Sequence, residues 1–190
     1  MRIADALLVP HQDDEVVFLW SQLADAQLCG VLCEAGYTRS MEGWIGLQQR
    51  FPQLRVVRYR VLEPLPARPS WGVVPGVLAL WDVTNTIVAL YEQMVAGGLH
   101  TLAIPGDTAV YGHPHHIQLQ EVLDDIASKE DLRLRFVQET EVALPSLEAW
   151  RKHDAAMTMY ASEREAWCRD GAVIDRLEAG TDWVRTYVVY

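Results

Sequence analysis

Apolar runs of strand length alternate with stretches of helical spacing along this chain of 190 residues, and the alternation predicts an α/β fold with a mostly parallel sheet. The clearest runs are residues 4–10, 30–33 and 101–105. Their composition is typical of strands buried on both faces of a parallel sheet. Polar stretches that contain histidine follow the first and the third run. Because open parallel sheets bind ligands beyond the carboxyl ends of their strands, we expect the active site at that edge.

The other elements follow from the same periodicities. Gly97 and Gly98 should end the helix that precedes the strand at 101–105. Alternation over residues 132–137 indicates a half-exposed strand near the sheet edge. The composition of residues 183–190 predicts an edge strand or a pairing with another subunit. Helices are expected over residues 15–26, 41–51, 82–97, 116–128, 145–160 and 162–167, and a further strand over 54–59.

A proline-rich segment, residues 62–75, interrupts this pattern. Its four prolines exclude a helix or a central strand. We therefore expect a long ordered loop or lid, and long loops in compact domains are often functional. Trp71 lies in this segment and is a candidate for stacking on a sugar ring, although anchoring the loop to the core is the commoner role of such a residue.

Length and charge limit the class of protein. The chain fits a single domain over residues 1–190 with room for a substantial core. Its formal net charge of −10 at pH 7 argues against nucleic acid and anionic membranes as partners. No apolar run reaches membrane-spanning length, so we expect no membrane insertion. A signal peptide would be cleaved within residues that look functional, so we expect a cytoplasmic protein.

The three cysteines, Cys29, Cys33 and Cys168, fit a reducing compartment. They are odd in number and irregularly spaced, and no Cys-x-x-Cys pair is present, which argues against a disulfide framework. We expect reduced thiols. Zinc binding by Cys29 and Cys33 is the less favoured alternative.

The first polar stretch is His-Gln-Asp-Asp-Glu at residues 11–15, between the first strand and the first helix. Asp13 and Asp14 are neighbours, so their side chains leave the backbone in different directions and make poor equivalent ligands of one ion. A division of roles fits better, in which one aspartate binds a metal with His11 and the other acts as general base toward the metal-bound water. Helix capping is the alternative, and it would explain one aspartate but not the histidine.

The second polar stretch is Tyr-Gly-His-Pro-His-His at residues 111–116, again between a strand and a helix. Three histidines in four residues are hard to explain as core packing, because an apolar core offers imidazoles few partners. A solvated histidine cluster is the alternative. Together the two stretches supply two imidazoles and one carboxylate, which leave open positions on a divalent ion, as catalytic zinc requires. The set would also suit non-haem iron, but a spare carboxylate favours hydrolysis.

Both stretches resemble motifs of the PIG-L/LmbE-like N-acetylglucosaminyl deacetylases. Residues 11–15 are similar to the His-Pro-Asp-Asp-Glu signature of that family, and residues 111–116 to its Tyr-Gly-His-Pro-Asp-His segment. Arg39 and Glu42 fit its Arg-x-x-Glu, and residues 153–163 resemble its late Lys-x-x-Ala-Leu-x-x-His/Tyr-x-Ser-Gln helix. The resemblance spans most of the chain and implies a Rossmann-like three-layer α/β/α fold with the active site at the carboxyl ends of the strands.

The resemblance also implies a role for individual residues. Asp13 would be the general base, His113 would stabilise the oxyanion or protonate the leaving amine, and Tyr111 would help to polarise the substrate carbonyl. Arg39 would contact substrate, and its alternative role is a surface ion pair with Glu42. The metal ligands would be His11, Asp14 and His116, and the candidate substrate-binding residues are Arg39, Glu42, Asp107 and Trp71.

The sequence therefore predicts a metal-dependent hydrolase that removes an acetyl or other acyl group from an N-acetylated amino sugar or glycoconjugate. Zn²⁺ is the expected cofactor, Fe²⁺ is an alternative, and a homo-oligomer is left open. A second interpretation is a catalytically impaired member that acts as a metal- or sugar-binding module. It is favoured by the absence of the usual glycines after Glu15 and by His115, which replaces an aspartate and should lower the pKa of His113.

Overall fold

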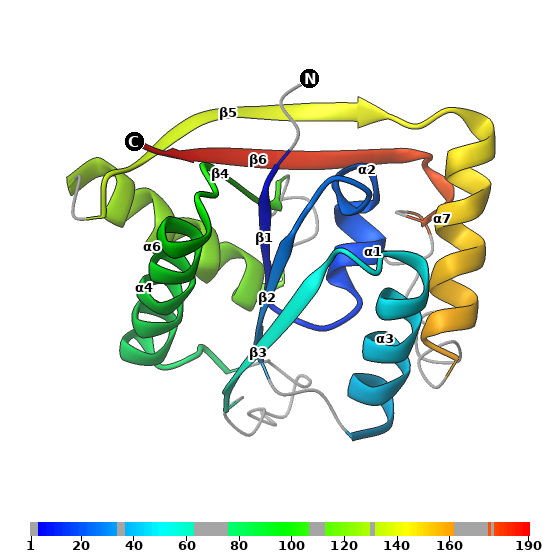
Figure 1. Cartoon of the computed structure of the whole chain (residues 1–190), viewed down its shortest axis with the longest axis horizontal. Helices are drawn as coiled ribbons and strands as arrows, with labels where there is room; N and C mark the ends of the chain where they lie inside the picture. Colours follow the sequence, from blue (N-terminus) through cyan, green and yellow to red (C-terminus); the bar gives the residue numbers. More distant parts are fainter. Residues whose placement is uncertain are drawn as a thin grey trace, which may run out of the picture.

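A six-stranded sheet forms the centre of the computed structural model (Figure 1). The structure describes residues 4–33, 37–62, 76–106, 113–129, 132–161, 175 and 177–190, with only the backbone over 37–40. The strands lie in the order β3-β2-β1-β4-β6-β5. Their bounds are Ala6–Val9 for β1, Leu28–Cys33 for β2, Arg55–Val61 for β3, Thr101–Pro105 for β4, Leu134–Ala143 for β5 and Thr181–Val189 for β6.

Four neighbouring strands of the sheet are parallel. β1 pairs in this direction with β2 and β4, and β2 pairs with β3. β6 runs antiparallel to both β4 and β5. The predicted α/β fold with a mostly parallel sheet is therefore confirmed, and the two C-terminal strands form its antiparallel part.

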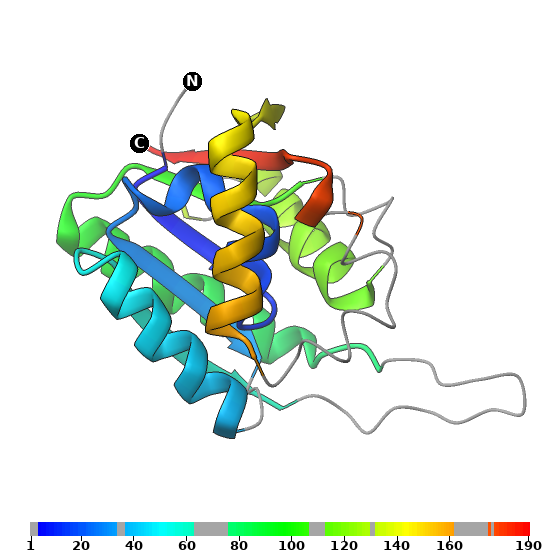
Figure 2. The ribbon, with the colours of Figure 1, turned by 90° about the vertical axis from the view of Figure 1, so that its right-hand side faces the viewer.

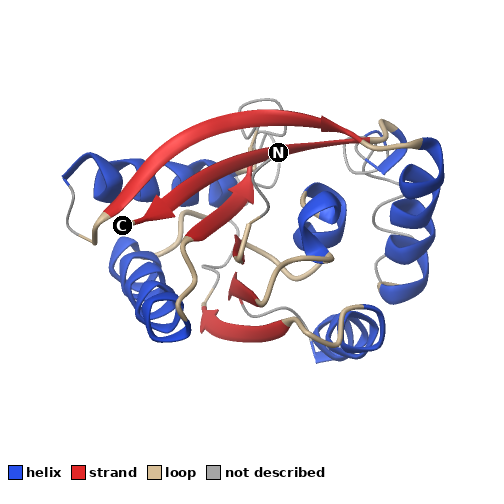
Figure 3. Cartoon of the chain, turned by 45° about the horizontal axis from the view of Figure 1, so that its top comes forward, coloured by secondary structure: helices blue, strands red, loops and turns tan. Residues whose placement is uncertain are grey.

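Helices cover both faces of the sheet (Figure 3). Alternate side chains of β1 belong to two different cores: Leu7 and Val9 to one, Ala6 and Leu8 to the other. The view in Figure 2 shows α3 and α7 on the first face. The helices of the first face are α1 (Asp14–Phe18), α2 (Trp20–Leu23), α3 (Tyr37–Arg50) and α7 (Ser146–Met159), and those of the second are α4 (Leu80–Gly97) and α6 (Pro114–Lys129).

The helix predicted over residues 15–26 is divided into α1 and α2 at Leu19, whose φ of −126° and ψ of 22° are not helical. The break creates a second helix N-terminus, whose N–H groups need acceptors. Asp182 satisfies one of them, because its Oδ2 accepts a hydrogen bond of 2.6 Å from the backbone N–H of Ser21. These two residues are 161 positions apart, so local periodicity could not reveal the break.

The C-terminal strand β6 lies inside the sheet, so the prediction of an edge strand or an intersubunit strand is wrong. It pairs with β4 on one side and with β5 on the other, and the fully buried Tyr187 lies opposite Leu102 and Phe136. β5 is an edge strand with a largely exposed pattern, which confirms the expectation for that segment. Composition predicted correctly that the last segment is a strand. The strands with which it pairs are decided by the topology of the whole chain.

Gly98 ends α4 as predicted. It has a φ of 65°, and its N–H is directed to the carbonyls of Met94 and Val95. The helix predicted over 162–167 and residues 63–75 of the proline-rich loop lie outside the described residues. Among the described helices, none combines the length and the apolar character needed to cross a bilayer.

Candidate metal centre

Three strand ends bring the two polar stretches together. β2, β1 and β4 are adjacent and parallel, so their carboxyl ends share one edge of the sheet. His11 lies just beyond β1, and Cys33 is the last residue of β2. His115 and His116 occupy the first turn of α6, which follows β4 in the chain. Side chains as far apart in sequence as His11 and His115, 104 positions, thereby come into contact.

His11, Asp14 and His116 form a group of potential metal ligands. Asp14 Oδ2 lies 3.2 Å from Nδ1 of His11 and 3.1 Å from Nε2 of His116. The ligand atoms of all three residues lie within 4.8 Å of one another. Ligands about 2.0–2.2 Å from a tetrahedral zinc ion lie roughly 3.3–3.6 Å apart, so small shifts would place these atoms around one ion. Imidazole and carboxylate donors suit both zinc and ferrous iron.

Burial and charge favour cation binding by this group. Asp14 and His116 are 4% and 2% exposed, and the side chain of His11 is 13% exposed. Burial alone would raise the pKa of Asp14, but the neighbouring imidazoles, His116 above all, lower it well below the usual range. Burial lowers the pKa of His11, whereas Asp14 and then Cys33 raise it, to about 10 overall. A cation therefore meets an ionised carboxylate and must displace a proton from His11.

Asp13 lies at the N-terminal boundary of α1 in a strained conformation. Its φ is 133°, in a region that residues other than glycine rarely adopt. Its carbonyl accepts hydrogen bonds from the N–H groups of Val16 and Val17, and its own N–H donates to Oε2 of Glu15. Its side chain makes no capping hydrogen bond, so helix capping does not account for this residue.

Glu15 connects Asp13 to Tyr160, at the end of α7. The fully buried Glu15 accepts the Asp13 N–H at 3.0 Å and a short hydrogen bond from the Tyr160 hydroxyl. Burial raises the pKa of Glu15 to about 7, although both hydrogen bonds lower it. Tyr160 needs the space beside Gly43, where an added Cβ would lie 2.5 Å from the tyrosine ring. Sequence reasoning gave neither Glu15 nor Tyr160 a role, and the one signal for Tyr160 was its place in the family-like segment 153–163.

His113 lies directly before α6, and its ring packs edge-on against the rings of His11 and His115, with both centroids 4.8 Å away. Its Nδ1 accepts the backbone N–H of His115 at 3.3 Å, which assigns the proton of the neutral ring to Nε2. Burial, and then the neighbouring imidazoles, lower the pKa of His113 to about 3. The direction agrees with the prediction, but burial is the first cause.

His115 and Cys33 form a second ligand group with His11; sequence reasoning gave Cys33 a ligand role only in the less favoured pair with Cys29, and gave His115 none. Nδ1 of His115 lies 2.9 Å from Nε2 of His11 and 3.9 Å from Sγ of Cys33. The ligand atoms of these three residues also lie within 4.8 Å of one another. Cys29 is not in the group, because it belongs to the other core cluster, so the alternative of a Cys29–Cys33 zinc pair is not supported.

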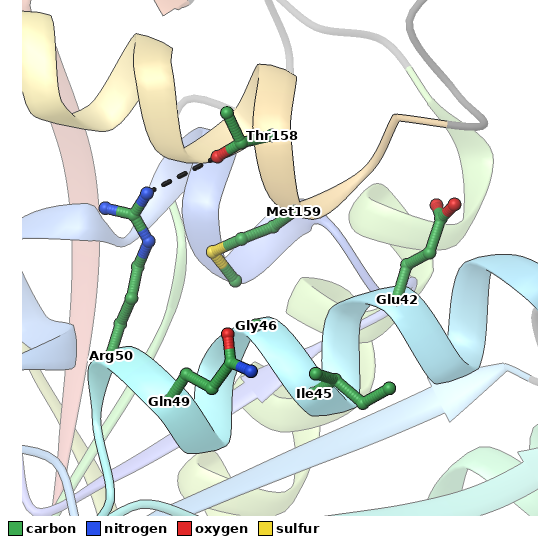
Figure 4. Close-up of a pocket in the computed structure, with 7 residues that line it drawn as sticks. All are labelled: Glu42, Ile45, Gly46, Gln49, Arg50, Thr158 and Met159. Carbon is green, nitrogen blue, oxygen red and sulfur yellow. Dashed lines mark hydrogen bonds between the residues drawn. The ribbon is translucent and has the colours of Figure 1, made fainter.

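The remaining predicted site residues are the four candidate substrate contacts and Tyr111. Glu42 lines a cavity of about 450 Å³ between α3 and α7 (Figure 4). Arg50 and Thr158 line the same cavity and are joined by a hydrogen bond of 3.3 Å. Trp71, Asp107 and Tyr111 lie outside the described residues, and only the backbone of Arg39 is described, within α3.

Comparison with known proteins finds similar folds but no similar sequence. No protein-family model and no curated protein matches the chain. The zinc-inhibited form of teicoplanin deacetylase Orf2 superposes with a TM-score of 0.64 at 11% identity, and a deacetylase–teicoplanin complex with 0.63 at 11%; each covers 96% of both chains. The A40926 pseudoaglycone deacetylase Dbv21 gives 0.59 at 12% identity, covering 100% of this chain and 97% of its own. At such identities the likeness shows a shared fold over the whole length.

Proposed function

We propose that this chain is a metal-dependent deacetylase of the PIG-L/LmbE-like type, which hydrolyses the acetamide of an N-acetylated amino sugar or glycoconjugate. The observation that carries the proposal is the approach of two imidazole nitrogens to one oxygen of Asp14, at 3.1 and 3.2 Å. A second buried carboxylate, Asp13, is adjacent in the chain. The fold supports the same activity, since the similar structures are named as deacetylases, and a glycoconjugate substrate, since one of them is a complex with teicoplanin.

His11, Asp14 and His116 are the proposed ligands of Zn²⁺, with Fe²⁺ as the alternative. When bound, the ion supplies Lewis-acid polarisation of the acyl carbonyl and of the attacking water. The protein holds the ligands in place through local contacts. The backbone N–H of His11 donates to Asp14 Oδ2 at 2.8 Å, and the ring of Phe18 packs edge-on against His116 with centroids 5.3 Å apart.

Asp13 is the proposed general base, which takes the proton of the attacking water. The hydrogen bond from its N–H to Glu15 holds its backbone in place. His113 is neutral at neutral pH, so its Nε2–H is suited to donate to the developing oxyanion and not to protonate the leaving amine. The amine would then receive its proton from Asp13. Tyr111 is proposed to donate a further hydrogen bond to the oxyanion.

The proposed substrate contacts are Arg39, Glu42, Asp107 and Trp71. The cavity beside Glu42, about 450 Å³, falls within the range of roughly 300–1,000 Å³ typical of small-molecule sites. A sugar moiety is compatible with that size. Teicoplanin-like glycoconjugates are proposed as a substrate class because of the fold likeness to the structures above.

The test is acetate release from a panel of N-acetylated amino sugars and glycoconjugates by zinc-loaded protein. We expect turnover by the wild type, and in His11→Ala and His116→Ala the loss of both turnover and the ion held by His11, Asp14 and His116. His100→Ala is the matched control, since His100 is exposed and its backbone N–H bonds to Asp5, away from the centre. Metal bound by the wild type without turnover on any substrate of the panel would support the metal- or sugar-binding module instead.

A further inference from the structure

A second set of metal-ligating atoms lies beside the proposed zinc ligands and includes a thiol. Sγ of Cys33 and Nε2 of His11 both face Nδ1 of His115, at 3.9 and 2.9 Å. In a tetrahedral zinc site, with bonds of about 2.0–2.1 Å to nitrogen and about 2.3 Å to sulfur, neighbouring donors lie roughly 3.3–3.7 Å apart. The two spacings to His115 bracket these values, and the ligand atoms of all three residues lie within 4.8 Å of one another, so modest shifts would place all three donors around one ion.

His115 is oriented for this role by a contact on the far side of its ring. Its Nε2 lies 2.8 Å from the backbone carbonyl of Gly76. Because a carbonyl oxygen only accepts hydrogen bonds, Nε2 carries the proton and the lone pair of Nδ1 is directed at Cys33 and His11. Metal-binding histidines are commonly held in one tautomer by such a contact. His115 and Cys33 are each 2% exposed, so these two side chains are shielded from water.

His11 belongs to both ligand sets through different nitrogens. Nδ1 faces Asp14 at 3.2 Å, and Nε2 faces His115 at 2.9 Å. A neutral imidazole has one lone pair, so it serves one ion at a time unless it loses its second proton. The two sets therefore share a ligand.

We propose that Cys33, His115 and His11 form a second cation site that takes a thiophilic ion, such as Zn²⁺ or Cd²⁺, in competition with the His11–Asp14–His116 site. A thiolate with two imidazoles is a donor set that selects soft and borderline ions over Mg²⁺ or Ca²⁺. The site goes beyond deacetylation, and it exists whether or not the chain is a deacetylase. Occupation of the second site would remove His11 from the first. An excess of a thiophilic ion would therefore lower the fraction of molecules in which His11, Asp14 and His116 together hold an ion.

Cobalt absorption distinguishes the two sites, because thiolate-to-cobalt charge transfer gives a near-ultraviolet band that imidazole and carboxylate ligands lack. We expect metal-free wild-type protein titrated with Co²⁺ to develop this band, and Cys33→Ser to lose it. Cys29→Ser is the matched control: it removes a buried thiol from the same strand but from the opposite core, and it should keep the band. Since even outer contacts of metal ligands are worth about 10–100-fold in affinity, loss of Cys33 should weaken the second site at least tenfold.

His116→Ala separates this proposal from the proposed function. It removes a ligand of the first site only, so His11 becomes available and the charge-transfer band should appear at a lower Co²⁺ concentration. His115→Gln, which removes a ligand of the second site only, should lose the band as Cys33→Ser does. Absence of the band in the wild type, or its persistence in Cys33→Ser, would overturn the second site. A titration curve that does not shift in His116→Ala would overturn the sharing of His11.

Discussion

Two clusters of buried charge in this molecule differ in how their charges are balanced. Lys152 and Asp182 are 0% and 1% exposed, and their side chains pair at 2.8 Å. Lys152 also donates to the carbonyl of Thr181 at 3.1 Å, and the second oxygen of Asp182 accepts the N–H of Ser21. One cation and one anion thus form a closed network that joins α7, β6 and α2.

The candidate metal centre is balanced differently, by a proton on an imidazole, because the pKa of His11 is raised to about 10. Asp14 and Glu15 are as deeply buried, but their side-chain partners within the described part of the chain are histidines and Tyr160, with no Lys or Arg. A buried ionised carboxylate is costly without a cation beside it, and in the metal-free protein the protonated His11 supplies that cation for Asp14. A bound metal ion would displace this proton and take over its role, whereas the cation of the lysine–aspartate pair is fixed in the protein. A cluster of buried carboxylates indicates a cation site where the Asp and Glu side chains outnumber the Lys and Arg side chains beside them.

Replacing Asp13 by Asn tests the functional cluster and should have the largest effect. Asp13 is the proposed acceptor of the proton from the attacking water, and Asn has the same size but cannot accept it, so kcat for acetate release should fall by about 10²–10⁴-fold. Metal content, measured by elemental analysis, should stay at the wild-type level, because His11, Asp14 and His116 are unchanged. Loss of metal in this variant would instead identify Asp13 as a ligand.

Lys152→Met tests the balanced cluster. It leaves Asp182 buried without its cation, so the free energy of unfolding in urea should fall by about 3–5 kcal/mol. Adding Asp182→Asn should recover most of the loss, because an amide oxygen still accepts the Ser21 N–H and the unpaired charge is gone. The metal affinity of the folded variants should equal that of the wild type. A change in metal affinity without a loss of stability would show that the two clusters are not distinct.

The pH dependence of metal binding sharpens the contrast. The pKa of His11 is raised to about 10, so the metal-free protein carries a proton there at neutral pH, and a cation must displace it. Affinity should therefore rise about tenfold per pH unit between roughly pH 7 and 9, and should level off above the pKa. Calorimetry in buffers of different ionisation enthalpy should report release of at least one proton per ion. Affinity independent of pH in this range would contradict the protonated state of His11.

Sequence patterns predicted that the polar residues at the site meet, because a general rule about parallel sheets applies to them. The groups around His11 and His116 each follow a strand, and parallel strands present their carboxyl ends at one edge, so the meeting of these residues could be expected. The order of β6 and β5 in the sheet could not be expected from the sequence, because the composition of a strand does not specify which strands it pairs with. Contacts between Glu15 and Tyr160 and between Ser21 and Asp182 span 145 and 161 positions and depend on the packed fold.

Cys33 shows a different limit of sequence reasoning. Regular alternation would place Cys29, Val31 and Cys33 on one face of β2. The pairing of β2 with β3 is irregular between Val31 and Cys33, and Cys33 joins the other core cluster. That irregularity places the thiol near His115. One local departure from strand geometry therefore decides whether this cysteine is a core residue or a potential ligand.

Asp13→Gly and Asp13→Ala test whether the metal centre also differs from the lysine–aspartate pair in backbone strain. Both variants lose the carboxylate, but only glycine adopts a φ of 133° without strain. Such strain costs about 1–3 kcal/mol, and glycine loses roughly 0.5–1 kcal/mol more conformational entropy on folding. The free energy of unfolding of the glycine variant should therefore be about 1 kcal/mol higher than that of the alanine variant. Both are measured by urea denaturation of metal-free protein. Equal stability would mean that the backbone relaxes at no cost, and the strained Asp13 would then owe its position to Glu15 alone.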